Sequence, residues 1–547
     1  MFAFVVANRY LRWYNYISIP KISAPKGVLG GKVMKKRIIS VILSAFFILS
    51  LIPLGIFNVS AATEGNFNYT VSGGKATITT VNKSISGDVT IPETLGGYPV
   101  TAINRNAFYN CTAITSVYIP AVVTSIGSGV FAKCTLLKSI TVAENNPQYY
   151  SLSNCLIDAV NNSIVAGCNL SEIIIPNGIV SIGDYAFAYC DALTKITLPE
   201  GLTNIGSNAF YSCKNLVTAG VPDSIKSIGA SAFDRCEKLE SINLPEGLLS
   251  IGMTAFYECK SLKGVKVPAS LTSVGSDAFS KCTGIESLTL SEGLSVLSEG
   301  MFESLSGITE LELPSSITVI PDSAFANCVN IENLVIPDTV ETIEDWAFSG
   351  GMNKKSIHIG SGVRSIGLNA FSGGYYLESI TVDEDNQYFS GEGNCLIEKS
   401  TNTIIRGCGG SVIPEGVTSI KDYAFAGCFR VTSINVPKSL TNVGNGAFSE
   451  CYYLKNVYYD GTKEESQNLT VGTNNSYLLN ATWHYKMLGD LSGDGLVDIL
   501  DVQDLFSVIV NGDMNEISLD VGDFNGDGEI NIFDVREIFV AVANGEI

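Results

Sequence analysis

The sequence predicts a repeat solenoid followed by a small all-α module. Three observations lead to this prediction: a phenylalanine that recurs every 23 residues, a unit that alternates helix-like and strand-like apolar spacing, and an acidic C-terminal segment that contains one loop pattern twice. At 547 residues the chain is too long for one compact core. A stack of short units buries apolar surface without needing such a core.

The N-terminal part of the sequence predicts a secretory leader. Residues 34–62 contain basic residues, a long apolar run and the small pair Ala61-Ala62, which together are typical of a signal peptide. We therefore expect a secreted, extracellular protein, cleaved after Ala61 or Ala62, with no membrane span after cleavage. An uncleaved anchor is the alternative, because the run is long enough to cross a bilayer. Residues 1–33 are interpreted as a non-native extension, with translation starting at Met34.

The repeat fixes the expected fold. Each unit approximates IGxxAFxxCxxLxxIxLPxGLTS, in which AFxxCxxL predicts a short helix, IxL predicts a strand and PxG predicts a turn. One unit cannot bury its own apolar face, so the units must stack into a mixed β/α solenoid. Two of the steps between phenylalanines are longer, 56 and 54 residues. The repeat phenylalanines are Phe108, Phe131, Phe187, Phe210, Phe233, Phe256, Phe279, Phe302, Phe325, Phe348, Phe371, Phe425 and Phe448.

The position three residues after each phenylalanine is usually cysteine. The same position holds Leu305, Gly351 and Gly374 in other units, so it is interpreted as an apolar position at which cysteine acts as a small hydrophobe. A ladder of disulfides between adjacent coils and a catalytic thiol are the alternatives. No CxxC pair or converging histidine supports metal binding there.

The two longer steps contain inserts near residues 143–175 and 383–413. The segments NCLIDAVNNSIVAGC and NCLIEKSTNTIIRGC each predict a hairpin with its turn at Asn161-Asn162 or Thr401-Asn402. Such hairpins would set two pairs of cysteines opposite each other. Disulfides are possible in a secreted protein, and buried thiols are the alternative. The possible pairs are Cys155 with Cys168 and Cys395 with Cys408.

The surface expected for the solenoid argues against several functions. A net charge of −20 argues against nucleic acid as a partner. The residue between the two buried strand positions is mostly an uncharged polar residue, and His358 has Val335 and Thr381 as its neighbours, so no titratable groups converge as an active site requires. Aromatic residues could form a contact stripe for sugar or protein, although partial burial between coils is the alternative. They are Tyr109, Tyr185, Tyr211, Tyr257, Trp346 and Tyr423.

The IGxxAFxxCxxLxxIxLP unit resembles the leucine-rich repeats of BspA-like bacterial surface proteins. The resemblance covers about residues 100–486. It implies an N-terminal β cap at 63–99, a solenoid at 100–457 and a C-terminal cap and linker at 458–487.

The acidic end predicts two calcium sites. From Gly489 onward the chain has 14 acidic residues and one arginine, and two loops with an offset of 33 residues follow the oxygen-rich EF-type pattern with glycine at position 6. We therefore expect two Ca²⁺ ions. The ligands of loop 1 are Asp490, Ser492, Asp494, the Leu496 carbonyl, Asp498 and Asp501; those of loop 2 are Asp523, Asn525, Asp527, the Glu529 carbonyl, Asn531 and Asp534.

Each loop leads into an expected helix with one apolar face, on which Val502, Leu505, Phe506 and Ile509 match residues 33 positions later. These loop-helix units resemble type I dockerins over residues 488–547. The resemblance implies docking to a cohesin module of a scaffoldin, read in part by loop positions 10 and 11. Those positions are apolar here, and they are Ile499, Leu500, Ile532 and Phe533.

The sequence therefore predicts a secreted, non-catalytic protein attached to a cellulosome-like scaffold, whose solenoid recognises an unknown protein or glycan. The alternatives are a glycoside hydrolase that degrades plant polysaccharide within the same assembly and a cell-surface adhesin.

Overall fold

The computed structural model describes residues 60–492, 496–512, 517 and 519–545. Most of the expected leader and all of the expected N-terminal extension lie outside the described residues. The expected cleavage site falls within β1 (Ser60–Glu64). Among the described residues, no helix has the length and apolar character needed to cross a membrane.

The N-terminal residues form a sheet of order β1-β2-β3-β6-β5, in which β8 also pairs with β6. β1, β2 and β3 pair antiparallel, whereas β3 and β6 pair in parallel. The sheet therefore changes from hairpin pairing to the parallel pairing that the coils continue. Its other strands are β2 (Phe67–Ser72), β3 (Lys75–Val81), β5 (Thr94–Leu95) and β6 (Tyr98–Ile103).

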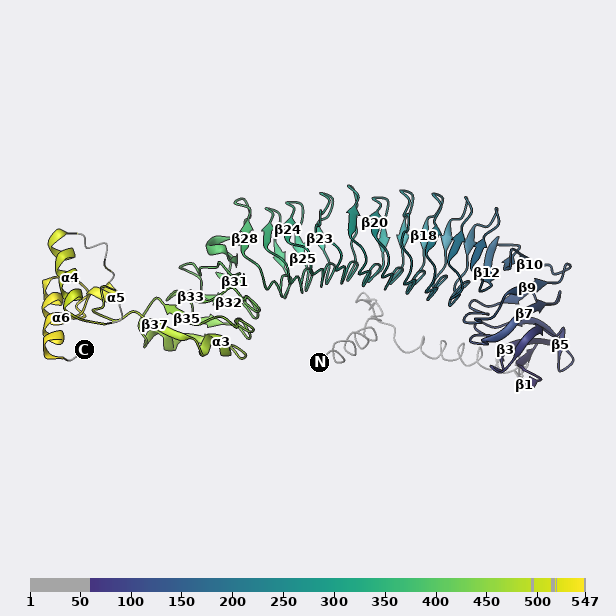
Figure 1. The fold of residues 1–547 in the computed structure, drawn as a ribbon, viewed down its shortest axis with the longest axis horizontal. Coiled ribbons are helices and arrows are strands. Elements are labelled where there is room, and N and C mark those ends of the chain that lie inside the picture. Colours follow the sequence, from purple (N-terminus) through teal and green to yellow (C-terminus); the bar gives the residue numbers. More distant parts are fainter. Residues whose placement is uncertain (1–59, 493–495, 513–516, 518, 546–547) are drawn as a thin grey trace, which may run out of the picture. The chain divides into compact units, whose positions relative to one another are not determined.

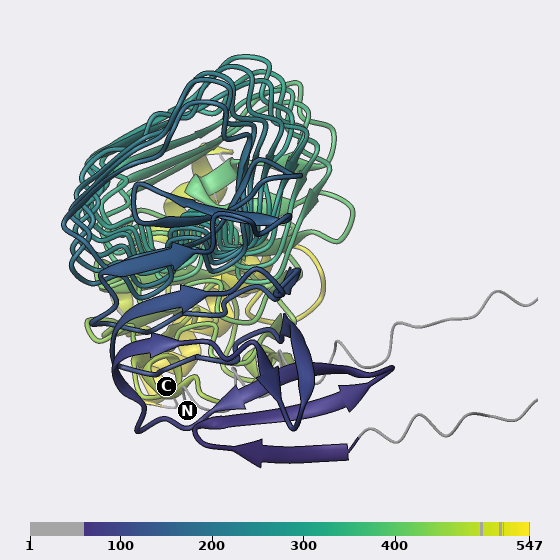
Figure 2. The same ribbon diagram turned by 90° about the vertical axis from the view of Figure 1, so that its right-hand side faces the viewer.

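The coils that follow stack in sequence order, as Figure 1 shows from β12 to β28 and as Figure 2 shows with the coils superimposed. The IxL segments form parallel strands along one side of the coils, which we call the long-strand ladder and which pair in five sheets. The strands are β4 (Ser86–Thr90), β7 (Ala113–Ile119), β9 (Ser139–Val142), β13 (Glu172–Ile174), β15 (Lys195–Thr197), β17 (Thr218–Gly220), β20 (Gly264–Val267), β22 (Ser287–Leu290), β24 (Asn333–Ile336), β26 (Ser356–Ile359), β28 (Ser379–Val382), β33 (Ser433–Val436), β35 (Asn456–Tyr459) and β37 (Thr482–Tyr485). Most of its inward residues are β-branched or leucine, which suits a buried pleated face.

A second ladder is formed by the two residues before the IG glycine. Every strand in it is two residues long: β8 (Ser125–Ile126), β14 (Ser181–Ile182), β16 (Asn204–Ile205), β18 (Ser227–Ile228), β19 (Ser250–Ile251), β21 (Ser273–Val274), β23 (Val319–Ile320), β25 (Thr342–Ile343), β27 (Ser365–Ile366), β32 (Ser419–Ile420), β34 (Asn442–Val443) and β36 (Thr470–Val471). The sequence analysis predicted one strand per unit, and the structure has two.

The prediction of a short helix in each unit is wrong. The AFxxCxxL segment forms consecutive turns, because a left-handed residue lies two positions before and two positions after each repeat phenylalanine. In the coil of Phe210 these residues are Asn208 and Ser212, each with φ of 57°. All thirteen units have positive φ at both positions. An α-helix cannot continue through such residues, since non-glycine residues adopt the left-handed region singly.

The left-handed residues also direct backbone hydrogen bonds between coils. The amides of Asn208, Phe210 and Ser212 donate to carbonyls of the next coil at 2.8, 2.7 and 2.8 Å. The intervening amides of Ala209 and Tyr211 close turns within the coil. Three of the five amides from Asn208 to Ser212 therefore bind across coils, as amides do in a sheet.

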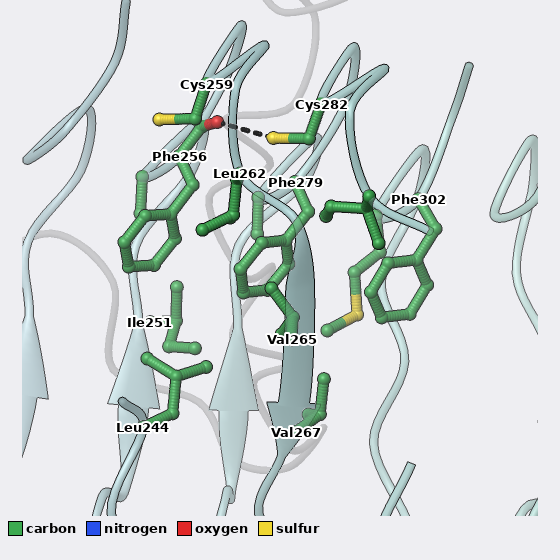
Figure 3. Close-up of a cluster of buried hydrophobic side chains, with 14 of the residues drawn as sticks. Leu244, Ile251, Phe256, Cys259, Leu262, Val265, Val267, Phe279, Cys282 and Phe302 are labelled. Atoms are coloured by element: carbon green, nitrogen blue, oxygen red, sulfur yellow. Dashed lines mark hydrogen bonds between the residues drawn. The ribbon is translucent and has the colours of Figure 1, made fainter. Parts of the chain in front are cut away.

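The repeat phenylalanines form a column inside the coils. From Phe187 to Phe371 successive rings lie 5.0 to 5.8 Å apart with their planes within 22° of each other. Figure 3 shows three of these rings, Phe256, Phe279 and Phe302, side by side. Each ring packs on the same ring of the neighbouring coil, which is a favourable aromatic arrangement that one unit alone cannot make.

The cysteines form a second column beside the rings. All fourteen cysteines of the chain are free and buried. Cys282 Sγ donates to the Phe256 carbonyl of the preceding coil at 2.9 Å (Figure 3), and Cys236 and Cys259 make the corresponding contact at 3.2 Å. The thiol thus packs as a small apolar group and also satisfies a buried carbonyl, which is the packing role that the sequence predicts.

Three coils lack the cysteine: buried Leu305 takes its place in one, and buried cations reach the same region in the coils of Gly351 and Gly374. A Cβ on Gly351 would lie 2.6 Å from Lys354 Nζ, which donates to the Phe348 carbonyl at 2.8 Å. Burial lowers the pKa of Lys354 to about 8, against the smaller opposing effect of the Cys328 thiol. Beside Gly374, Arg406 donates to four backbone carbonyls at 3.2 to 3.4 Å. Long side chains that bind carbonyls therefore fill the volume left by the missing thiols.

Both inserts form antiparallel hairpins with turns where the sequence predicts them. The strands are β10 (Tyr149–Leu152), β11 (Cys155–Asp158) and β12 (Ser163–Gly167) in the first insert, and β29 (Phe389–Ser390), β30 (Leu396–Glu398) and β31 (Thr403–Arg406) in the second, with the 3-10 turn η2 (Glu392–Asn394) between β29 and β30. β12 and β31 then pair in parallel with the next coils.

The structure contains neither of the possible hairpin disulfides. The register places Cys155 opposite Gly167, one residue short of Cys168, with a bulge at Leu156/Ile157. A one-residue shift sends side chains to opposite faces, and Cys155 and Cys168 accordingly lie in different apolar clusters. Cys395 and Cys408 are separated in the same way. All four are free thiols: Cys155 and Cys395 donate to nearby backbone carbonyls, and Cys408 Sγ donates to the Asn394 carbonyl and accepts from Ser411 Oγ.

The glycine beside each hairpin cysteine has a structural role that the sequence analysis did not find. A Cβ on Gly167 would lie 1.9 Å from the ring of Phe187, and one on Gly407 would lie 2.0 Å from the ring of Phe425. The ring of the next coil therefore occupies the space above the hairpin backbone. Only glycine leaves that space open.

A C-terminal cap follows the coils, and a helical part follows the cap in sequence. η3 (Glu465–Asn468), α3 (Ser476–Leu479) and β37 close the solenoid, and Trp483 and Tyr485 pack against its last cluster. The final residues form α4 (Ile499–Asn511), α5 (Leu519–Gly522) and α6 (Ile532–Asn544). Val502, Leu505, Val535 and Ile538 make the small core of this helical part.

A buried carboxyl lies in the turn segment of one coil. Asp234 is 9 % exposed, and its Oδ1 has no hydrogen-bond partner and is 3.9 Å from Arg235 Nε. Burial raises the pKa of Asp234 to about 6, against the opposing effect of Arg235 and with a smaller contribution from Glu258. Its ionised form is therefore unfavourable in the folded coil.

Replacing Gly167 by alanine should destabilise the contact between the first hairpin and the next coil, because the new methyl group overlaps the Phe187 ring. We expect a loss of about 1–3 kcal/mol, as is usual for overpacking, measured as a lower midpoint of thermal unfolding. Gly220→Ala is the matched control, since a Cβ there meets no atom within 4 Å. Equal midpoints for both variants would contradict the role assigned to Gly167.

Replacing Asp234 by asparagine should stabilise the protein at pH 7.5 by about 1 kcal/mol relative to the wild type. The folded carboxyl stays protonated up to about pH 6, whereas the carboxyl in the unfolded chain ionises near its ordinary pKa of 3.8. Wild-type stability therefore falls as the pH rises through that window, and the variant lacks this loss. Melting curves from pH 4 to 8 test this, with the exposed Asp223→Asn variant as control. A difference that does not change with pH would refute it.

Candidate calcium loops and recognition surfaces

The two loops of the C-terminal part share one hydrogen-bond frame at the expected offset. Asp501 Oδ1 accepts from the amides of Leu491 and Ser492 at 2.9 and 2.8 Å, and its Oδ2 accepts from Asp498 N at 2.8 Å. In the second loop Asp534 Oδ1 accepts from Asn525 N at 3.0 Å and its Oδ2 from Asn531 N at 2.8 Å. Both carboxylates are fully buried. Loop position 12 therefore faces the inside of each loop.

Loop position 9 caps the following helix in both halves. Asp498 accepts from Leu500 N at 2.7 Å and Asn531 accepts from Phe533 N at 2.8 Å, and each forms a capping box with the acid at position 12. Burial acts to raise the pKa of Asp501, but hydrogen bonds from the backbone amides of Asp498, Ser492 and Leu491 outweigh it and lower that pKa. The carboxylate is therefore ionised at neutral pH.

The second loop is described in full, and its oxygens gather along one bend. Asp523 accepts from the amides of Asp527 and Gly528 at 3.0 and 2.8 Å, Asn525 accepts from Asp527 N at 2.8 Å, and Asp527 accepts from Glu529 N at 3.0 Å. Gly528, at loop position 6, has φ of 87°, which the sharp turn of an EF-type loop requires.

The first loop is described only in part, because Asp494 lies outside the described residues. Within the described part, Ser492 Oγ donates to Asp490 Oδ1 at 3.4 Å.

In the part of the chain that the structure describes, no three His, Cys, Asp or Glu side chains gather closely enough to hold a metal ion. The two predicted sets of calcium ligands also include side-chain amide, hydroxyl and backbone carbonyl oxygens. The donors are hard oxygens, and the buried acids have no lysine or arginine partner among the described ion pairs, so the residues fit a hard divalent cation.

The predicted docking residues lie at the surface of the helical part. Ile499 and Leu500 begin α4 and are 44 % and 52 % exposed, and Ile532 and Phe533 begin α6 and are 48 % and 60 % exposed. The sequence analysis placed Phe506 and its match Phe539 on the apolar helix faces with Leu505, but both are 49 % exposed. Each half therefore presents apolar side chains to solvent.

The outward residues of the long-strand ladder stand in register along the solenoid. His358 pairs in register with Val335 and Thr381, and its Nδ1 lies 3.0 Å from Thr381 Oγ1. Lys266 forms an ion pair with Glu246 at 2.7 Å. His358 and the Lys266–Glu246 pair therefore lie in separate coils of this face.

The sequence analysis missed three members of this outward ladder. Ile174 aligns with Thr197 and is 68 % exposed, and Val412 is 54 % exposed before Ile413-Pro414 of the second insert. His484 aligns with Tyr458, and their rings stack at 4.6 Å and 15°. These residues belong to coils that lack AFxxC, although the IxIP spacing of the inserts could have revealed two of them.

An open groove of about 1040 Å³ runs beside the last strands of this ladder. Its lining includes Asn435, Tyr458 and His484 from three adjacent strands, with Asp460 and Lys486 joined by an ion pair of 2.5 Å. His484 Nε2 lies 3.0 Å from Asn456 Oδ1. The groove is lined by both aromatic and polar side chains, which is typical of a ligand-binding site. No acid and base among these lining residues are arranged around a nucleophile, so the groove suits binding rather than catalysis.

The aromatic stripe that the sequence predicts is divided in the structure. Trp346 and Tyr423 are 43 % and 42 % exposed, whereas Tyr109 and Tyr211 are half-buried and contact Tyr189 between coils. Cations lie over Tyr185 and Tyr257. Partial burial between coils therefore applies to the N-terminal members.

Solved structures of other bacterial repeat proteins are similar to this chain. A leucine rich cell surface protein from Faecalibacterium prausnitzii is 27 % identical, with 75 % of this chain and 97 % of that chain covered and a TM-score of 0.43. A leucine-rich repeat protein from Bacteroides ovatus is 23 % identical, covering 78 % and 100 %, also with a TM-score of 0.43. The pneumococcal vaccine antigen PcpA is 17 % identical, covering 73 % and 70 %, with a TM-score of 0.21. No curated protein matches.

The family comparison covers most of the solenoid. The BspA type leucine rich repeat region matches residues 82–163, 158–286, 272–395 and 410–476 in six copies. These ranges include more than half of the 547 residues, and the stacked coils carry the repeat phenylalanines and cysteines of that pattern. The chain therefore belongs to the family of BspA-type leucine-rich repeat proteins.

Proposed function

We propose that this protein is a secreted, non-catalytic recognition module that is attached to a cohesin-bearing scaffold through its calcium-dependent C-terminal helical part. The family assignment supports a recognition or adhesion role for the solenoid, since BspA-type repeats are typical of cell-surface proteins and typically non-enzymatic. The attachment is supported by the acidic end of the chain.

The observation that carries the attachment is the duplicated frame around Asp501 and Asp534. Two fully buried carboxylates each accept amide hydrogen bonds from their own loop, at positions 33 residues apart. These bonds hold an ionised oxygen ligand at position 12 of each loop, and the other predicted ligands of the loops are the hard oxygens that a divalent cation binds. Two such loop-helix units in tandem resemble a type I dockerin, residues 488–547, whose partner is a cohesin module.

The solenoid supplies the recognition surface of this proposal. Its outward ladder is mostly uncharged and contains polar residues together with exposed apolar residues such as Ile174 and Val335, and the groove near Tyr458 and His484 offers room for a ligand. Long repeat surfaces bind by shape and contact area rather than by a single reactive group. A protein or a glycan is the proposed ligand class.

Calcium titration of the full chain tests the attachment. We expect two ions per chain by isothermal titration calorimetry, one ion for Asp523→Ala, and two ions for Asp504→Asn, which removes an exposed α4 charge outside the loops. The reason is that Asp523 lies at loop position 1 and accepts two loop amides. No calcium uptake by the wild type would sink the proposal.

Docking to a cohesin module should survive the loss of either half, because the two loop-helix units match at each exposed position. Ile499→Asp with Leu500→Asp, or Ile532→Asp with Phe533→Asp, should each retain most of the affinity measured by surface plasmon resonance. The four substitutions together should remove at least about 2 kcal/mol, the scale of an interface hot spot. Complete loss in one pair alone would reject docking by either half.

A further inference from the structure

The residue after the cysteine position changes character along the solenoid. In the N-terminal coils it is polar or charged: Thr112, Thr135, Asp191, Lys214, Glu237, Lys260, Thr283 and Ser306. From the coil of Cys328 onward it is apolar or aromatic: Val329, Met352, Tyr375, Phe429 and Tyr452. The backbone around this position is the same in each coil. The fold therefore tolerates a charge there, and folding does not require the aromatic residues.

The aromatic residues at this position contact each other across coils. Tyr375 and Phe429 rings lie 4.7 Å apart at 6°, Phe429 and Tyr452 lie 5.5 Å apart, and Tyr452 and Tyr477 lie 5.2 Å apart. The next residue along the chain adds Tyr376 and Tyr453. We call these six residues the aromatic strip: Tyr375, Tyr376, Phe429, Tyr452, Tyr453 and Tyr477.

The aromatic strip is open to solvent despite its size. Tyr376, Tyr452 and Tyr453 are 47 %, 55 % and 58 % exposed. The Arg430–Glu378 ion pair, at 2.5 Å, involves the residue that follows Phe429 in the same coil. Tyr375, Phe429 and Tyr477 are half-buried beside the exposed tyrosines. Exposed tyrosine beside arginine is the composition of a contact surface between proteins. A contiguous exposed aromatic patch is uncommon on a protein without a partner.

We propose that the aromatic strip is a docking surface for a proline-rich segment of another protein, bound in the polyproline II conformation along the coil axis. This inference rests on the proposed recognition function of the solenoid and names its partner class. It concerns a different surface from the groove at Tyr458 and His484.

The spacing of the rings favours this ligand. Two steps along the strip, from Tyr375 through Phe429 to Tyr452, cover about 10 Å, close to the ~9.3 Å of one polyproline II turn of three residues. Every third residue of such a segment therefore meets every second ring. The two-residue repeat of a β-strand, about 6.6 Å, does not match this spacing.

The chemistry of the strip agrees with the spacing. Proline has no backbone N–H, so a proline-rich segment brings no unsatisfied donor onto an apolar surface. Its carbonyls make no internal hydrogen bonds and can accept from tyrosine hydroxyls. Aromatic surfaces that bind proline-rich segments are an established recognition mode.

The test uses the full-length protein and fluorescently labelled peptides of about twelve residues with proline at every third position and the other positions varied. We expect saturable binding by fluorescence polarisation for the wild type, and at least tenfold weaker binding for the double variant Tyr452→Ser with Tyr453→Ser. Lys260→Ser is the matched control, since Lys260 holds the same position in a polar coil, and should bind like the wild type. A glycine-serine peptide of equal length should not bind.

The outcomes separate this inference from the proposed function. Absence of peptide binding by the wild type, or equal binding by the Tyr452/Tyr453 variant at an unchanged thermal midpoint, overturns the inference. Loss of glycan-array binding in that variant without any peptide binding assigns the strip to sugar and also overturns it. Calcium uptake and cohesin docking are measured on the same preparations, so their failure counts against the attachment and not against the strip.

Discussion

The solenoid depends on a pair of left-handed residues in each unit. They lie four positions apart on either side of the repeat phenylalanine, and they turn alternate amides toward the next coil. A segment with the apolar spacing of a helix is thereby converted into a stack of turns whose hydrogen bonds run between coils. Each unit completes its backbone bonding only when a neighbour is present, so the coils are stable as an array and not singly.

The side-chain columns follow from that backbone. Because every coil holds its phenylalanine at the same place, the rings stack at a spacing of 5.0 to 5.8 Å in the middle of the array. In most coils the thiol donates to the backbone carbonyl of the repeat phenylalanine in the preceding coil. Where the thiol is missing, Lys354 and Arg406 reach the same region and bind carbonyls. The cysteines are therefore part of the packing and hydrogen bonding of the core.

Much of the fold could be predicted from the sequence, because a fixed period constrains the backbone more strongly than local propensity does. The 23-residue step predicts the stack, and alternation in IxL predicts the long-strand ladder. The helix prediction failed because AFxxCxxL has helical spacing, and the left-handed positions hold Trp346, Tyr185 and Lys281 as well as the asparagines and glycines that would mark them. The hairpins were predictable from their turns, but a bulge in each one shifts the register by one residue and separates the cysteines.

The candidate sites differ in how far the sequence reveals them. The two loops can be predicted from the sequence because the predicted ligands of each loop are close together in the chain. The aromatic strip is assembled from coils 23 and 54 residues apart, and it becomes visible only when Tyr375 and Phe429 are placed side by side across the second insert. That insert adds a hairpin to one side of the coil and leaves the strip continuous on another.

The hairpin inserts also divide the interior into compartments. No ring contact joins Phe131 to Phe187 or Phe371 to Phe425 among the described residues, and the apolar clusters change at Cys155/Cys168 and at Cys395/Cys408. A tether at one end and a bound load along the coils would put the molecule under tension. The chain would then unfold under force first at these two inserts and in discrete steps. Each group of coils that stayed folded would keep its part of the binding surface intact.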